Sequence, residues 1–99
     1  MLHIRIYSHI YFMHSLAHIP NPLEVLKHLK ENYQAMITVI TPNKEWLDPD
    51  YNNDTTVIRH YSQTELKDLF EYSGYEVTLI GQFGEIRNGI NERIFLQAR

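Results

Sequence analysis

The chain has 99 residues, a net charge of −3 with histidine counted as neutral, and 43% hydrophobic residues. This length suits one small domain, and the apolar content is too high for a disordered chain. The absence of cysteine excludes disulfides, thiolate catalysis and cysteine metal ligands. The charges are scattered rather than gathered into a basic stripe, so we expect no nucleic-acid partner.

Apolar runs in this sequence are short. None approaches the roughly 18 residues that a membrane-spanning helix needs. Arg5 and several histidines interrupt the first apolar stretch, which is therefore unlike a secretory signal. We expect a protein with no membrane partner and a cytoplasmic location.

Residues 2–12 alternate between apolar and polar side chains. Ile10 and Phe12 fall on one side, whereas His9 and Tyr11 fall on the other. A period of two predicts a half-buried strand, and its length favours a break near Ser8.

A helix is predicted over residues 22–32. Asn21 is a suitable capping residue, Pro22 suits the first helical position, and Glu24 has capping-box spacing. The apolar side chains that recur at helical spacing are Leu23, Leu26, Leu29 and Tyr33.

Residues 36–41 form a short β-branched run that predicts a strand covered on both faces, as in a parallel sheet. Pro42 and Asn43 stop this strand. The polar residues 43–60 are read as a long loop, and loops of this length often act as lids or binding loops.

A second helix is predicted over residues 63–73, because Ser62 and Glu65 have capping-box spacing and Gly74 suits the C-terminal cap. The rest of the chain predicts a strand over 75–80, a turn over 81–89 and a strand over 93–98, the two strands pairing antiparallel. The order of elements predicts an α/β domain with a mixed sheet and one reversed strand.

Several phrases in this order resemble one family. Residues 14–22 read HSLAHIPNP, residues 36–43 form a strand that ends in Pro-Asn, and residues 60–66 read HYSQTEL before a helix that ends in Gly-Tyr. Their order and spacing over residues 9–99 resemble the C-terminal half of class I S-adenosylmethionine-dependent methyltransferases. The resemblance implies a partial Rossmann-like methyltransferase sheet, with the order strand-helix-strand-helix-strand-strand and an antiparallel C-terminal hairpin.

The resemblance also implies a function. Complete relatives transfer a methyl group from S-adenosylmethionine to a small-molecule acceptor, mainly by positioning the reactants, so no universal catalytic residue carries over. The family's glycine loop and its ribose-gripping acidic residue have no counterpart in this sequence. We therefore expect a shortened methyltransferase that binds the cofactor weakly or not at all when alone.

The expected site lies at the carboxyl ends of the strands, where open sheets bind ligands. By resemblance, His14 and Ser15 line the cofactor, whereas the acceptor meets the four residues His18, Pro42, Asn43 and Tyr61. Each also has a structural reading, such as packing for His14, a hydrogen bond to the following turn for His18, a strand stop for Pro42 and Asn43, and packing onto the following helix for Tyr61.

Three further groups of residues remain open at this point. His9, His14 and His18 are a weak candidate for a metal site, because the prolines after Ile19 argue against a helix there, and we expect no metal. Trp46 and Tyr51 belong to a lid, to a contact with a partner or to packing over the sheet end. The terminal hairpin is read mainly as a solvated turn, although the resemblance implies that Glu92 and Arg93 could reach the substrate pocket. The polar residues of the hairpin are Arg87, Asn88, Asn91, Glu92 and Arg93.

An alternative function is a non-catalytic interaction module. If the strand over residues 2–12 is an open sheet edge, it can pair with another chain, either a second copy or a separate N-terminal half of the fold. A third interpretation is a reading frame whose true start lies upstream.

Overall fold

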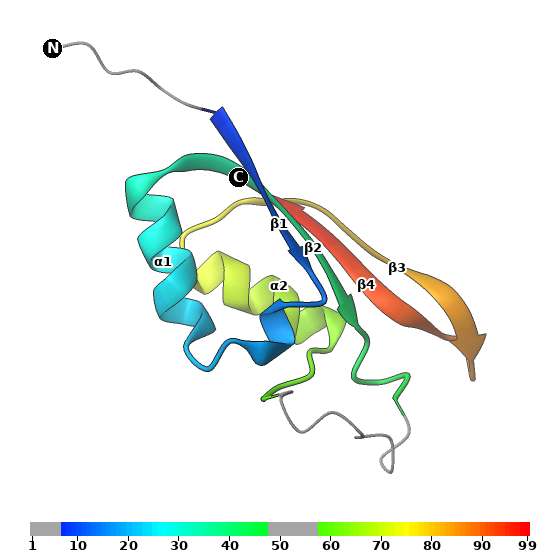
Figure 1. Ribbon diagram of the computed structural model, residues 1–99. Coiled ribbons are helices and arrows are strands. Elements are labelled where there is room, and N and C mark those ends of the chain that lie inside the picture. The colour runs from blue at the N-terminus through cyan, green and yellow to red at the C-terminus, as the bar shows by residue number, and fades with distance from the viewer. Residues whose placement is uncertain (1–6, 48–57) are drawn as a thin grey trace, which may run out of the picture.

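The computed structural model describes residues 7–47 and 58–99, and it shows an α/β arrangement (Figure 1). The beginning of the strand predicted over residues 2–12, and most of the loop predicted over 43–60 with Tyr51, lie outside the described residues. The elements follow in the order β1 (Tyr7–Met13), the 3-10 helix η1 (Leu16–His18), α1 (Pro22–Asn32), β2 (Gln34–Pro42), α2 (Gln63–Tyr72), β3 (Val77–Arg87) and β4 (Ile90–Ala98).

The described strands form one mixed sheet in the order β1-β2-β4-β3. β1 and β2 are parallel, whereas β4 lies between β2 and β3 and is antiparallel to both. This confirms the prediction of a mixed sheet that ends in an antiparallel hairpin. Because β4 runs against its neighbours, the β3–β4 turn lies at the same end of the sheet as the carboxyl ends of β1 and β2 (Figure 1).

The bounds of α1 agree with the prediction, but its cap does not. The Asn21 side chain makes no capping hydrogen bond, and only its carbonyl oxygen accepts a bond from the Val25 N–H, at 3.1 Å. The predicted buried stripe is also narrower than expected, because Leu26 is buried whereas Leu23 and Tyr33 are exposed. Tyr33 has extended backbone angles and so leaves the helical stripe.

The start of α2 confirms the predicted capping box. The Ser62 side chain accepts a hydrogen bond from the Glu65 N–H at 3.2 Å, and the Glu65 carboxylate accepts one from the Ser62 N–H at 3.1 Å. The bond from the Ser62 backbone is the main cause that lowers the pKa of Glu65, and Lys44 adds to it. Gly74 follows the helix with φ of +94°, as expected for a C-terminal cap.

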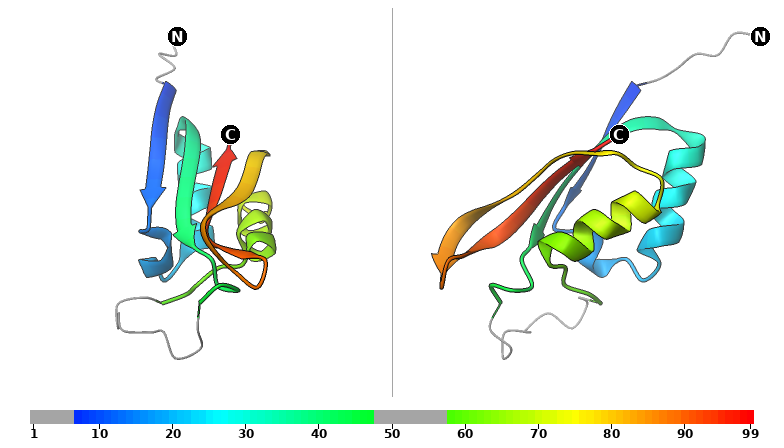
Figure 2. Two further views of the ribbon diagram at one scale, coloured as in Figure 1. Left: turned by 90° about the vertical axis from the view of Figure 1, so that its right-hand side faces the viewer. Right: turned by 180° about the vertical axis from the view of Figure 1, so that it is seen from behind.

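Both α-helices cover the same face of the sheet (Figure 2). We call this the inner face; it carries the buried side chains Phe12, Ile37, Val39, Ile94, Leu96 and Ala98. The opposite, outer face carries Tyr11, Met13, Met36 and Leu79, which are 60, 52, 45 and 50% exposed. The prediction that both faces of β2 are covered is therefore wrong for the part of the chain that the structure describes.

The terminal hairpin is longer than predicted. Residues 81–87, expected in a turn, continue β3, and only Asn88 and Gly89 separate the two strands. This position of β3 requires a glycine, because a Cβ on residue Gly81 would lie only 2.6 Å from the Phe95 ring. Gly84 has φ of +93° next to a shift in register between Phe83 and Ile86, which is typical of a bulge.

No helix within residues 7–47 and 58–99 has the length and apolar character required to span a bilayer.

Replacing Ser62 with alanine is expected to lower the free energy of unfolding by about 1 kcal/mol, because α2 loses its capping hydroxyl. Urea denaturation followed by circular dichroism measures this loss. Thr64→Ala in the same helix is the control, because Thr64 is exposed and its replacement should change stability by less than about 0.5 kcal/mol. Equal effects of the two substitutions would contradict the capping role.

Candidate functional site

The carboxyl ends of β1 and β2 and the β3–β4 hairpin enclose a pocket of about 280 Å³. The register of β2 with β4 ends at Pro42 and Arg93, with one more backbone bond from the Asn43 N–H to the Glu92 carbonyl oxygen, whereas β3 and β4 stay paired as far as Arg87 and Ile90. The hairpin therefore projects beyond the end of β2, and the pocket lies beside this projection. Its lining consists of His14, Pro42, Trp46, Leu47, Arg87, Glu92 and Arg93.

His14 directly follows β1 and has a strained backbone conformation. Its φ of 62° lies in the left-handed region, which residues other than glycine seldom adopt. The His14 N–H donates to the Ile40 carbonyl oxygen at 2.8 Å, which continues the pairing of β1 with β2 for one more residue. The chain then turns into η1, so the exposed His14 side chain stays at the sheet end, where the pocket lies.

Ser15 and His18 lie at the two ends of the next turn. Ser15 precedes η1 and is exposed, and its carbonyl oxygen accepts a bond from the His18 N–H at 3.0 Å. His18 is half-buried and is not part of the pocket lining. Thus, of the residues predicted for the cofactor and acceptor, His14 and Pro42 line the pocket together, whereas Ser15 and His18 lie along the connection that follows β1.

Asn43 is fully buried and joins three segments. Its backbone N–H donates to the Glu92 carbonyl oxygen at 2.8 Å. Its side-chain amide donates to the Gln82 side chain at 3.2 Å and to the Asn91 carbonyl oxygen at 3.0 Å, and its oxygen accepts from the Glu45 N–H at 3.1 Å. These bonds place Asn43 behind the pocket as the support of the hairpin and of the loop after β2.

Tyr61 is the partner of Asn43 on the other side of this loop. The two residues form a parallel bridge, and the Lys44 N–H donates to the Tyr61 carbonyl oxygen at 2.9 Å. The Tyr61 side chain is only 2% exposed, and burial is the main cause that raises the pKa of its phenol. Arg59 acts in the opposite direction, and Glu65 adds to the increase. The phenol is therefore neutral at physiological pH.

The loop after β2 closes against the hairpin through Trp46 and Arg87. The Arg87 guanidinium carbon lies 3.9 Å from the centroid of the Trp46 ring, a cation–π contact. Arg93 pairs with Glu92, with 3.4 Å between Nε and the carboxylate oxygen. The sequence marked Trp46 and the hairpin arginines as open candidates but contained no signal for their contact, which depends on the register of β3 and β4.

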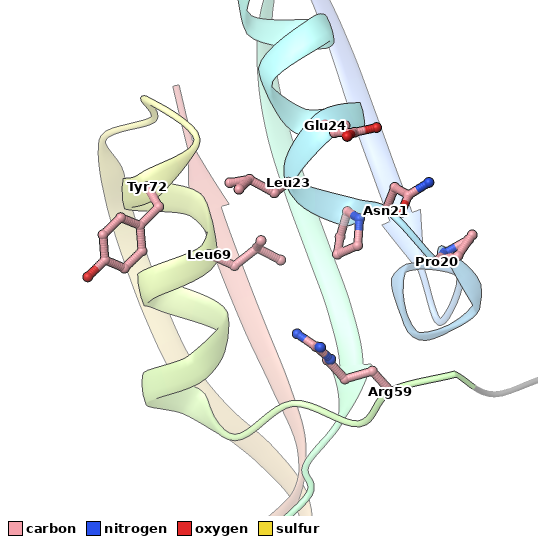
Figure 3. Close-up of a pocket in the computed structure, with 8 residues that line it drawn as sticks. Pro20, Asn21, Leu23, Glu24, Arg59, Leu69 and Tyr72 are labelled. Carbon is pink, nitrogen blue, oxygen red and sulfur yellow. The ribbon is translucent and has the colours of Figure 1, made fainter.

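A second pocket, of about 400 Å³, lies between α1 and α2 (Figure 3). Figure 3 shows the Arg59 side chain extending toward the gap between Leu69 and the start of α1. None of the residues predicted for the cofactor or the acceptor lines this pocket. The other histidine considered for a metal, His9, instead hydrogen-bonds Thr38 on the outer face at 2.6 Å.

Replacing Asn43 with alanine is expected to lower the free energy of unfolding by about 2–3 kcal/mol, because buried partners lose their hydrogen bonds. Urea denaturation measures this loss, and the emission of Trp46 should shift because the loop after β2 loses its support. Asn32→Ala is the control, since Asn32 is exposed and, among the described residues, its side chain bonds only to His28 in its own helix. Unchanged stability and emission in Asn43→Ala would contradict the supporting role.

Comparison with known proteins adds to this geometry. A family model described as a methyltransferase domain matches residues 5–80. A chain in the structure of the Pnkp1/Rnl/Hen1 RNA repair complex is similar in fold, with a TM-score of 0.69 and 16% identity, over 98% of this chain and 23% of that one. The crystal structure of the methyltransferase CalO6 is also similar in fold, with a TM-score of 0.64 and 10% identity, over 93% of this chain and 35% of that one. A search of curated proteins found no significant match.

The present chain thus spans about a quarter to a third of the length of these two solved structures. Its sheet order, with an antiparallel strand between two others, agrees with the resemblance seen in the sequence. The family model matches more than half of the residues. The chain therefore belongs to the methyltransferase-domain family, of the class I S-adenosylmethionine-dependent type.

Proposed function

We propose that this chain forms the acceptor side of an S-adenosylmethionine-dependent methyltransferase that acts on a small molecule. The observation that carries the proposal is the pocket at the carboxyl ends of β1 and β2, in a chain that belongs to a methyltransferase family. Open α/β sheets bind their ligands at this edge. The cytoplasmic location expected from the sequence belongs to the same proposal.

The proposed roles are those that the family resemblance implies. His14 and Ser15, which follow β1, are assigned to the cofactor, whereas His18 and Pro42 are assigned to the acceptor, although only His14 and Pro42 of these four line the pocket. Asn43 and Tyr61, also predicted for the acceptor, are buried, so we assign them to shaping its pocket. The cofactor supplies an electrophilic methyl group on a sulfonium, and the chain's part is to hold an acceptor O, N or C atom in line with it.

A second candidate function is pairing with another copy of the chain. Two observations favour it: β1 is an edge strand of the described sheet, and the outer face of β1 and β2 carries the exposed side chains of Tyr11, Met13 and Met36. An open edge offers unpaired N–H and C=O groups to another strand. In this proposal the partner copy pairs along β1, and methyl transfer is not required.

Calorimetric titration with S-adenosylhomocysteine, the product form of the cofactor, tests the first proposal. We expect weak, saturable binding with a Kd of roughly 0.1–1 mM, because the glycine loop that usually holds this molecule is not among these 99 residues. Ser15→Trp should abolish the binding by filling the space next to the end of β1. Thr64→Trp, on the exposed side of α2, is the matched control and should leave it unchanged.

Sedimentation of the same samples separates the two candidates. Binding by a monomer supports the methyltransferase proposal alone, and binding that appears only with dimerisation indicates a site completed by a second copy. A dimer that gives no heat of binding with S-adenosylhomocysteine up to millimolar concentration would support the pairing function. A monomer without heat would contradict both proposals and leave the family relationship as ancestry only.

A further inference from the structure

The pocket at the end of β1 and β2 carries more positive than negative charge. Its lining residues include two arginines, Arg87 and Arg93, and one glutamate, Glu92. With His14 counted as neutral, these groups leave one net positive charge. The rest of the lining, formed by Pro42, Trp46 and Leu47, is largely apolar. The chain as a whole has a net charge of −3, so the charge of the pocket lining is opposite in sign to that of the whole chain.

Arg87 is positioned by an aromatic ring rather than by an acid. Its guanidinium lies over Trp46, and among the described residues no carboxylate pairs with it. A guanidinium is planar and its N–H donors match the two oxygens of a carboxylate or phosphate, and contact with a ring restricts how that plane can turn. The contact therefore positions Arg87 to bind an anion without first breaking an ion pair to any carboxylate among the described residues.

Arg93 adds a second group of donors. Its Nε faces the Glu92 carboxylate, so this ion pair fixes the orientation of the guanidinium at the pocket wall. A guanidinium has five N–H groups, of which Nε carries only one. Glu92 is the less exposed partner, with 27% of its side chain accessible against 44% for Arg93. The arginine is thus the more open of the two charges toward solvent.

We propose that this pocket binds a small planar organic anion, and that the methyl acceptor carries a carboxylate or phosphate group held by Arg87 and Arg93. The inference rests on the proposed function in naming this anion as the acceptor. A volume of about 280 Å³ lies just below the usual range for ligand pockets, so the acceptor is compact. Trp46 and Pro42 supply the apolar surface for its planar part.

The only tryptophan of the chain lies in this pocket, and its indole N–H gives a single resonance in a ¹H–¹⁵N NMR spectrum. We would titrate the protein with 4-hydroxybenzoate, phenyl phosphate and the neutral 4-hydroxybenzamide. At least one of the two anions should shift this resonance saturably and bind at least tenfold more tightly than the amide. Raising the salt concentration should weaken binding of the anion and leave binding of the amide unchanged, because salt screens charges.

Variants identify the residues that hold the anion. Arg93→Gln and Arg87→Gln should each weaken binding of the preferred anion at least fivefold and leave the amide unchanged. Arg99→Gln is the matched control, because Arg99 pairs with Glu76 beyond the other end of β4. If Arg87→Gln loses the fold by circular dichroism, because the hairpin needs its contact with Trp46, Arg93→Gln carries the test.

Equal binding of anions and amide, or unchanged anion binding in Arg93→Gln, would overturn the inference. The result is independent of the titration with S-adenosylhomocysteine. Anion selection without cofactor binding would establish the anion site and contradict the methyltransferase proposal. Cofactor binding without anion selection would support the methyltransferase proposal and contradict the anion site. Preference for phenyl phosphate over 4-hydroxybenzoate would indicate a phosphate ester, and the opposite preference a carboxylate.

Discussion

The hydrogen bonds of one buried side chain, Asn43, hold the candidate site together. This residue follows the last residue of β2, and its amide reaches Gln82 in β3 and the Asn91 carbonyl oxygen in β4. Its backbone continues the pairing of β2 with β4 through the Glu92 carbonyl oxygen. A buried amide with its groups satisfied favours a single arrangement, because any other leaves polar atoms without partners. The end of β2 and the projecting hairpin are therefore fixed relative to each other.

The position of the pocket follows from this junction and from the direction of β4. Because β4 is antiparallel to β2, it begins at the end of the sheet where β1 and β2 finish. Arg93, in β4, is thereby placed opposite Pro42, and Arg87 reaches across to Trp46. The charges of the pocket come from the hairpin, whereas His14 and Pro42 come from the parallel strands. The reversed strand thus brings basic side chains to the ligand-binding edge of an otherwise ordinary α/β sheet.

Local signals in the sequence were sufficient to predict where the two α-helices begin. The bounds of α1 follow from Pro22 and the helical spacing, and the box of Ser62 and Glu65 starts α2 where predicted. The hairpin was predicted less well, because Gly81 and Gly84 read as turn residues. Gly81 instead makes room for the Phe95 ring on the neighbouring strand, a requirement that appears only once β3 and β4 are paired.

The same distinction holds for the site. His14 and Pro42 were predicted from their places at strand ends, and the structure brings them to one pocket. The hydrogen bonds of buried Asn43 and the contact of Arg87 with Trp46 join residues about 40 to 50 positions apart. They depend on the register of the strands rather than on any local pattern in the sequence. The expected burial of both faces of β2 rested on its β-branched composition, which does not distinguish one covering layer from two.

The most direct test of this account is a map of chemical shifts in ¹H–¹⁵N NMR spectra during titration with S-adenosylhomocysteine. The account predicts that the amide signals of His14 and Ser15 shift most and saturate together, whereas those of Glu76 and Arg99, at the opposite end of the sheet, stay in place. Shifts confined to the cavity between α1 and α2, or the absence of saturable shifts at millimolar ligand, would contradict it.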